Sequence, residues 1–500
     1  MRHIRYICIV LSLPLADIVW SQNIDIKQYM EQMTKNFNDY EVQQQQSFKE
    51  YRSQLNAEFA EYMRQAWPEY EAKPADPLPD CPEPPAPVIK DPDTPPSNDP
   101  VPFDEVKPAP KPVEPLQPVV PLPKPKPQPV EPNKPISPET PRFNFTFYGT
   151  PCAVSLTAAH RFRLSDVDEN SVADAWLQLS SDKYSSVIAD CLEWRDKLRL
   201  PDWGYVRFVE KMTTSFFTPT LINEARLMQM YILTQSGYKV RIARAGNSFV
   251  LLLPSKENIY QYPYLTINGR RYYVVDKNAR HKSYCVFDKE FPKEQYFSLQ
   301  MSEKPLLSVK NTTPRTLTST RFAAVSATVV SNRNLVDFYN DYPLTDSWDV
   351  YVISSLSEDV KKQLYPVLQN AIDSKSKSEA TNILLNFVQT AFAYKTDEAQ
   401  FGYERPLFAD ETLYYPYSDC EDRAILYSVL VRELLGLEIV LLHYPGHLAT
   451  AVCFDAEVSG DYMIIGGKRY TVCDPTYINA DIGQAMPQYK QTVATVIKIQ

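Results

Sequence analysis

One short acidic segment near the C-terminus decides the expected fold, and it reads Tyr417-Ser418-Asp419-Cys420-Glu421-Asp422-Arg423-Ala424. Apolar residues follow at helical spacing as far as Leu434, and Gly436 stands at the C-cap position. Ser418 or Asp419 is the expected N-cap, so Cys420 falls in the first turn of a predicted helix. A helix N-terminus stabilises anions and therefore favours a thiolate there. The alternative is a buried cysteine that only opens a core helix.

The residues after this helix supply two further side chains of catalytic type. Residues 437–442 and 447–454 have the apolar, β-branched pattern of buried strands, with Pro445-Gly446 as the turn between them. His447 starts the second strand. Asp474 ends a later hairpin strand, where Pro475 stops pairing because it has no backbone donor. We expect His447 and Asp474 to converge on Cys420.

These residue types indicate acyl-transfer chemistry. A Cys420 thiolate attacks a carbonyl carbon, His447 takes and returns the proton, and Asp474 orients the imidazole. The backbone N–H of Cys420 contributes to an oxyanion hole, with Tyr415 and Tyr417 as candidates for the second donor.

Each assignment in this set has an alternative. His443 is a second candidate base, at the other side of the turn from His447. Asp474 before a proline is also typical of a turn cap. Cys453 and Cys473 lie within apolar strands, where a small core residue is the expected role, and Cys473 should face away from Asp474.

The segment has a counterpart earlier in the chain. Ala225, Leu227 and Gly237 match Ala424, Leu426 and Gly436 at one constant offset, and the hairpin ending at Asp276 matches the one ending at Asp474. Both copies predict a helix, a glycine stop, two strands, a hairpin and a further strand; the alternative is chance similarity. Leu221 stands in the place of Cys420, and Ser248 or Asn247 in the place of His447. The first copy therefore lacks the chemistry and is expected to be a scaffold.

Three motifs together resemble the transglutaminase-like superfamily, a papain-like α+β fold. They are Ser418-Asp419-Cys420-Glu421-Asp422-Arg423-Ala424, Gly446-His447-Leu448-Ala449-Thr450-Ala451-Val452 and Cys473-Asp474-Pro475-Thr476-Tyr477. The resemblance covers residues 387–482 and implies Cys420 as nucleophile, His447 as base and Asp474 as the orienting residue. Many members have a tryptophan after the histidine, whereas Leu448 stands here.

The first 142 residues divide into three expected segments. Residues 1–21 have the charges, apolar core and small residues of a secretory signal, with an uncleaved anchor as the alternative. Residues 22–67 predict an amphipathic helix, which either self-associates as a coiled coil through residues 24–63 or packs on its own domain or a partner. Residues 68–142 hold 27 of the 43 prolines and predict an extended linker, here interpreted as a spacer rather than a recognition ligand.

Composition excludes several classes of partner. The net charge of -9 without a basic block argues against nucleic acid. His443 and His447 are separated by Pro445 and Gly446, which breaks any shared helix, so neither a zinc site nor a cofactor is expected. The cysteines outside the signal are scattered and predict no disulfide framework.

The sequence as a whole predicts an α+β protein with two tandem papain-like units, a degenerate one over residues 143–318 and a catalytic one over 319–500. The expected activity is that of an exported cysteine hydrolase or acyltransferase acting on peptide or protein amides at the periplasm or cell surface, with cell-wall peptide as one candidate substrate. Hydrolysis is favoured over amine transfer because no amine-binding feature is visible. The alternative is a non-catalytic envelope assembly protein that uses both units as scaffold.

Overall fold

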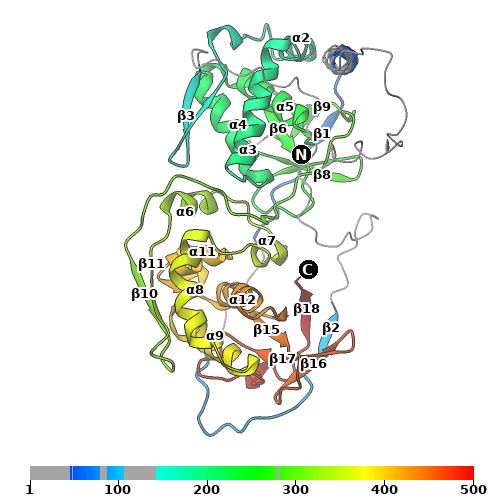
Figure 1. Cartoon of the computed structure of the whole chain (residues 1–500). Coiled ribbons are helices and arrows are strands. Elements are labelled where there is room, and N and C mark those ends of the chain that lie inside the picture. The colour runs from blue at the N-terminus through cyan, green and yellow to red at the C-terminus, as the bar shows by residue number, and fades with distance from the viewer. Residues whose placement is uncertain (1–45, 48, 79–86, 106–141, 277–280, 500) are drawn as a thin grey trace, which may run out of the picture. The chain divides into compact units, whose positions relative to one another are not determined.

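The computed structural model describes residues 46–47, 49–78, 87–105, 142–276 and 281–499. The expected α+β class is confirmed, with two six-stranded sheets and helices packed on them (Figure 1). The predicted signal, residues 1–21, lies outside the described residues. In the part of the chain that is described, no helix combines the length and apolar character needed to cross a bilayer.

The first sheet has the strand order β1-β9-β5-β6-β8-β7. Its strands are β1 (Glu69–Glu71), β5 (Arg241–Ala245), β6 (Ser248–Leu253), β7 (Tyr264–Ile267), β8 (Arg270–Val274) and β9 (Ser283–Val286). The helices of this region are α2 (Glu169–Leu179), α3 (Ser185–Lys197), α4 (Asp202–Phe216) and α5 (Ile222–Gln235), and β3 (Phe143–Phe147) and β4 (Thr150–Val154) form a separate hairpin.

The second sheet has the order β16-β17-β15-β14-β18-β2. Its strands are β2 (Phe103–Glu105), β14 (Glu438–Tyr444), β15 (His447–Cys453), β16 (Tyr462–Ile465), β17 (Lys468–Cys473) and β18 (Ala494–Lys498). Around it lie α6 (Arg333–Asn340), α7 (Trp348–Val352), α8 (Glu358–Ile372), α9 (Lys377–Thr390), α10 (Asp397–Phe401), α11 (Ala409–Tyr414) and α12 (Cys420–Leu430), with short strand pairs β10 (Arg315–Thr318) with β11 (Ser326–Val329) and β12 (Ala393–Tyr394) with β13 (Tyr417–Ser418).

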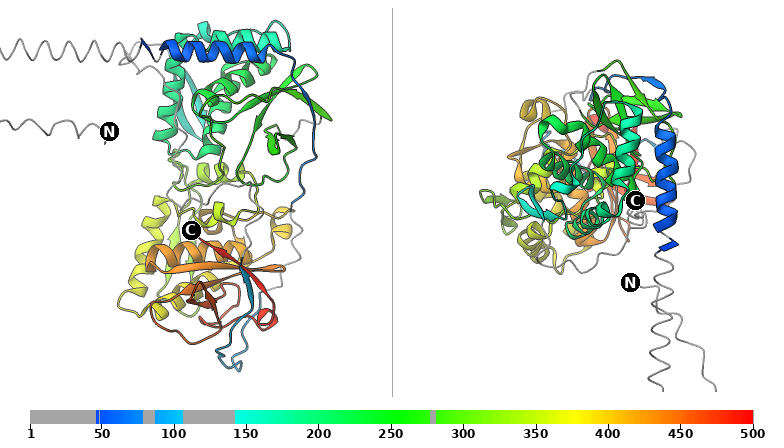
Figure 2. Two further views of the ribbon diagram at one scale, coloured as in Figure 1. Left: turned by 90° about the vertical axis from the view of Figure 1, so that its right-hand side faces the viewer. Right: turned by 90° about the horizontal axis from the view of Figure 1, so that it is seen from above.

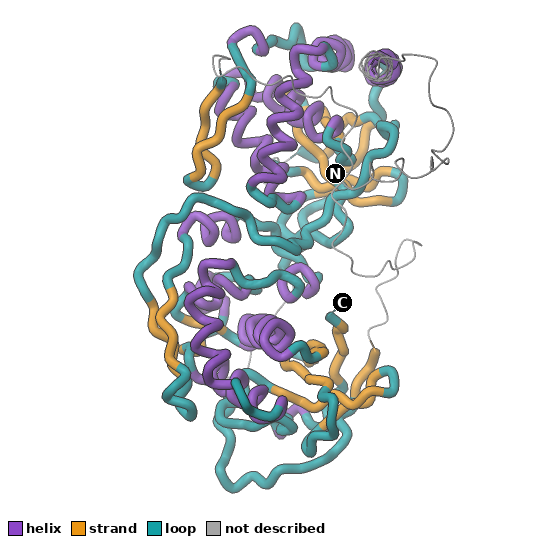
Figure 3. Tube along the Cα trace, in the orientation of Figure 1, coloured by secondary structure: helices purple, strands orange, loops and turns teal. Residues whose placement is uncertain are grey.

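The central element of this second region is α12. All 11 of its residues are buried, because α7, α9 and α11 pack on it together with β15 (Figure 3). A helix that is buried on every side must find partners for its polar end groups inside the protein. A five-residue π-helical turn, Val431–Leu435, continues it to Gly436, whose φ of +66° ends the helix in the left-handed conformation.

The two sheets share one topology. In each, the helix and glycine are followed by an antiparallel pair, a hairpin and a last strand that returns beside the first, so that β9-β5-β6-β8-β7 corresponds to β18-β14-β15-β17-β16. The two-residue turns also match: Ala245 pairs with Ser248, and Tyr444 pairs with His447. This is the order of elements expected for both copies.

The expected boundary between residues 318 and 319 cuts through a hairpin. Leu317 of β10 packs in the same apolar core as Ala327 and Val329 of β11 and as α8 and α9. The second region therefore begins before Arg315, because the hairpin needs both of its strands to bury one face.

The proline-rich segment differs from the expected spacer where it is described. Glu69–Glu71 pairs with β9, and Phe103–Glu105 pairs in parallel with β18, so each sheet takes an edge strand from this segment (Figure 2). Between them, Ile89 forms a bridge with Ile478. Proline is tolerated at sheet edges, where one side of the strand needs no partner. Residues 79–86 and 106–141 lie outside the described residues.

The predicted N-terminal helix packs on the chain's own globular part over its last turns. Residues 49–63 are helical, and from Asn56 onward the side chains contact the first region. The Phe59 ring lies 5.1 Å from that of Trp176 and 5.1 Å from that of Phe291, and Asn56 Oδ1 accepts hydrogen bonds from Trp176 Nε1 and Gln235 Nε2. Most of residues 24–63, the range expected to self-associate, precedes this contact, and residues 24–45 are not described.

We predict that Phe59→Ala lowers the free energy of unfolding of the full chain by about 3–5 kcal/mol, because it leaves a cavity among the three aromatic rings of Trp176, Phe287 and Phe291. Urea denaturation followed by tryptophan fluorescence measures the change, with the exposed Ser53→Ala on the same helix as control. Equal stability of both variants at low protein concentration would show that the helix packs on a partner instead.

Candidate active site

Cys420 is the first residue of α12, and the start of that helix is held by several backbone contacts. Asp419 is the N-cap, and its N–H donates to Asp422 Oδ2 over 3.4 Å. Asp422 Oδ1 accepts the N–H of Leu407 at 2.9 Å, so this side chain makes contacts at the helix end. Because these contacts fix the first turn, the thiol lies at the positive end of the helix dipole.

His447 opens β15 directly after the hairpin turn. The turn has two residues, and Gly446 adopts φ +70°, which places Tyr444 and His447 opposite each other. The imidazole lies parallel to the ring of Tyr489 at 4.8 Å, and it is buried. His443 directly precedes Tyr444 on β14, so its side chain lies on the opposite face of the sheet from His447, where it is exposed. The structure therefore separates the two candidate bases.

Asp474 follows β17 and meets His447 at the same end of the sheet. His447 Nε2 lies 2.8 Å from Asp474 Oδ2. Oδ1 of the same carboxylate accepts the N–H of Thr476 at 2.9 Å. Asp474 is therefore both the partner of the histidine and the turn cap that was its alternative role. Cys473 donates back to the Thr471 carbonyl within the core, as strand alternation predicted.

Gln389 on α9 fixes the loop that holds Asp474, a role that the sequence gave no reason to assign. Its Nε2 lies 3.1, 2.7 and 3.0 Å from the carbonyl oxygens of Asp474, Tyr477 and Ala480. One amide thus joins three points of a turn that has no regular pairing. The signal is recognisable only with hindsight, since Gln389 is one of several buried polar residues of α9.

The charge of Asp474 controls the protonation of His447. Burial alone would lower the pKa of this histidine, but the charge and hydrogen bond of Asp474, together with those of Cys420, raise it from 6.5 to about 10. At neutral pH the ring therefore carries a proton on both nitrogens. Nδ1 is buried beside Cys420 but has no partner within full hydrogen-bond geometry, and the thiol donates instead to Glu421 Oε2 at 3.0 Å.

A buried Nδ1–H without an acceptor is costly, and the neighbouring sulfur is the group that can relieve it. The α12–β15 packing brings the helix start beside the strand that His447 opens (Figure 1). The thiolate form of Cys420 can accept the Nδ1–H of this imidazolium, and the two side chains then form a buried ion pair of the kind found in activated cysteine nucleophiles.

The two tyrosines considered as oxyanion donors lie in different surroundings. The Tyr415 hydroxyl donates to Asn340 Oδ1 at 2.9 Å, and its ring contacts Phe401 and the Arg405 guanidinium. The Tyr417 side chain is exposed beside Lys395. Neither hydroxyl is hydrogen-bonded to Cys420 or His447 among the contacts of the described residues, and a donor role for either residue stays a prediction.

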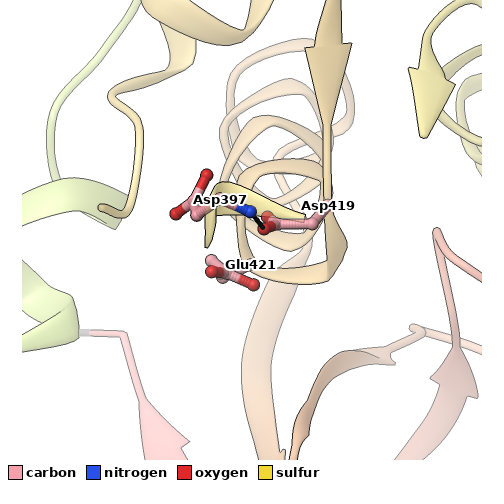
Figure 4. Close-up of side chains that lie close together, drawn as sticks. All are labelled: Asp397, Asp419 and Glu421. Atoms are coloured by element: carbon pink, nitrogen blue, oxygen red, sulfur yellow. Dashed lines mark hydrogen bonds between the residues drawn. The ribbon is translucent and has the colours of Figure 1, made fainter. Parts of the chain in front are cut away.

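Three buried carboxyl groups surround the start of α12 next to the thiol. Asp397, Asp419 and Glu421 each offer an oxygen within 4.8 Å of the others, which makes them the candidate cation ligands among the described residues (Figure 4). Burial, together with repulsion within this group, raises the pKa of Asp397 to about 10, that of Glu421 well above its usual range, and burial raises that of Asp419 to about 7. The sequence drew attention to Glu421 and Asp419 but not to Asp397.

The first region has the same frame without this chemistry. Leu221 directly precedes α5, Ser248 opens β6, and Arg226 Nη2 pairs with Asp276 Oδ2 at 2.8 Å. The aspartate that holds a histidine in the second region thus holds an arginine in the first.

Comparison with known proteins does not assign a function to this site, so its role is argued from its geometry. No protein-family model, no curated protein and no solved structure matches the chain. The six cysteines that the structure describes, Cys152, Cys191, Cys285, Cys420, Cys453 and Cys473, are all free thiols.

We predict that Asp474→Asn lowers the pKa of His447 from about 10 to below its ordinary 6.5, since burial then outweighs the remaining attraction. Histidine-selective NMR titration measures the shift, with His443→Gln used to assign the second hairpin resonance. In the wild type the raised pKa stabilises the fold fully below pH 6.5, and this stabilisation is lost as the pH rises through about 10. An unchanged His447 titration in Asp474→Asn would contradict the pairing.

Proposed function

We propose that the C-terminal region is a cysteine-dependent acyl-transfer domain of transglutaminase-like, papain-like type, with Cys420 as nucleophile, His447 as acid and base, and Asp474 as the residue that orients His447. The observation that supports it most is the 2.8 Å contact from His447 Nε2 to Asp474 Oδ2, because it leaves Nδ1 as the ring nitrogen that can serve a thiol at the start of α12.

The reaction follows from these positions. The Cys420 thiolate attacks an amide carbonyl, an S–C bond forms, and the C–N bond breaks as His447 Nδ1 gives its proton to the leaving amine. Water then attacks the thioester, with His447 as base, and the acid leaves as the thiol is restored. On this proposal the backbone N–H of Cys420, at the start of α12, stabilises the developing oxyanion. An amine in place of water would make the same site a crosslinking enzyme.

The burial of Cys420 and His447 affects both the formation and the hydrolysis of the thioester. Cys420 is 4% exposed and His447 is 3% exposed, so an amide reaches the sulfur only after neighbouring side chains move. The ring of Tyr489, which is only half-buried and stacks on His447, is the neighbour best placed to move. An enclosed site strengthens the ion pair by excluding water. Hydrolysis is the proposed outcome; export and an envelope substrate belong to this proposal as predictions from the sequence alone.

We predict that a small chloroacetamide probe labels Cys420 in the wild-type chain at neutral pH faster than it labels Cys453, which is only partly buried on β15. His447→Gln should slow labelling of Cys420 by roughly 10²-fold, the lower range for loss of a general base. Peptide mass spectrometry at timed intervals measures both rates within one sample, so Cys453 is the internal control.

Cys420→Ala should remove this label and leave that of Cys453 unchanged. Labelling of Cys420 at the same rate in wild type and His447→Gln would contradict the proposed activation, and would favour the scaffold interpretation in which the triad geometry has no chemical consequence.

A further inference from the structure

The start of α12 holds more buried carboxyl groups than the acyl-transfer proposal uses. Asp397 on α10 and Asp419 and Glu421 at the start of α12 are each at most 3% exposed. Ionised carboxylates at this depth are unfavourable unless a positive group or several donors compensate them. Each of these three carboxyl groups therefore needs a positive group or hydrogen-bond donors next to it.

Each carboxyl group is held by one oxygen and leaves the other without a partner. Arg405 N donates to Asp397 Oδ2 at 2.7 Å, Asp397 N to Asp419 Oδ2 at 3.2 Å, and the Cys420 thiol to Glu421 Oε2 at 3.0 Å. The second oxygens, Asp397 Oδ1, Asp419 Oδ1 and Glu421 Oε1, are buried and accept no hydrogen bond. Buried polar atoms of native proteins rarely stay unpaired, so these three oxygens point to an absent partner.

Neither of the two neighbouring arginines forms an ion pair with the three carboxyl groups. Arg423 reaches from α12 to Ser418 Oγ and to the carbonyls of Gln389 and Phe392. Arg405 pairs with Glu411. Among the described residues no lysine, arginine or histidine forms an ion pair with any of the three carboxylates. Among the described residues, no cationic side chain is therefore placed against the three unpaired oxygens.

From this arrangement we infer that Asp397, Asp419 and Glu421 bind a hard divalent cation, Ca²⁺ or Mg²⁺, at the start of α12 (Figure 4). The three carboxyl groups face one another in the close-up, and oxygens within 4.8 Å of one another can share one such ion. Oxygen-only ligands select Ca²⁺ and Mg²⁺ over softer metals.

The backbone supports this assignment in a second way. Asp397 N binds Asp419 Oδ2, which ties α10 to the start of α12 across 22 residues of chain. A cation shared by the same two segments would hold the intervening loop, residues 398–418, against the helix. Binding should therefore stabilise the fold, and it does not depend on whether Cys420 is a nucleophile.

The experiment is isothermal titration of the metal-stripped full chain with CaCl₂ and, separately, MgCl₂ at pH 7.5, together with thermal unfolding in chelator and in excess cation. The test variant is Asp397→Asn, because the amide oxygen can still accept the Arg405 N–H while the charge is removed. The matched control is Asp455→Asn, an exposed carboxylate after β15.

We expect one saturable site in the wild type and in Asp455→Asn, with a rise in Tm on binding, and an affinity reduced at least about tenfold in Asp397→Asn. His447→Gln should bind the cation like the wild type, which separates this site from the acyl-transfer proposal. Circular dichroism in chelator shows whether Asp397→Asn folds; removing a repelling charge should leave its Tm at or above that of the wild type.

Two results would overturn the inference. One is the absence of saturable binding up to about 10 mM, well above the range of weak calcium modules, which would mean that a shared proton compensates the cluster. The other is equal affinity in Asp397→Asn and wild type, which would place the cation elsewhere.

Discussion

The complete burial of α12 is the constraint on which the second region depends. A helix packed on all sides by α7, α9, α11 and β15 cannot leave its first N–H groups or its charged first-turn residues to water. The acidic residues Asp419, Glu421 and Asp422 are therefore drawn into contacts inside the protein, and so is Arg423. The same burial that makes these contacts obligatory also creates the dry environment in which the Cys420–His447 pair would act.

The internal comparison separates what the fold needs from what the site needs. The first region has the same strand order, the same two-residue turn and an aspartate at the same place, yet Leu221 and Ser248 replace the cysteine and histidine. There Arg226 satisfies Asp276. Since this sheet forms with Leu221 and Ser248 in place of Cys420 and His447, the cysteine and the histidine of the second region are not required by the topology. The buried cysteine and histidine occur in the copy to which the acyl-transfer proposal assigns the chemistry.

Much of this arrangement was predictable from local patterns. The helix from Cys420 to Gly436, the strand that His447 opens and the stop after Asp474 follow from periodicity, glycine and proline. Their convergence could be expected because β15 and β17 are neighbours in any such hairpin arrangement. Asp397 was not predictable, because its approach to Asp419 depends on a loop without a periodic pattern. Gln389 and Tyr489 act through contacts 85 and 42 residues away in the chain. The edge strands at Glu69–Glu71 and Phe103–Glu105 were hidden by a proline content that elsewhere indicates a free linker.

The central claim, that Cys420 forms a covalent acyl intermediate, is tested most directly by intact-mass spectrometry. The full chain is incubated with a library of amide peptides, quenched in acid and digested to locate the adduct. The account predicts an acyl adduct on Cys420 that hydroxylamine removes, as expected of a thioester, and none in Cys420→Ala. Amide cleavage that persists in Cys420→Ala, or the absence of any adduct on Cys420 with every peptide, would contradict it.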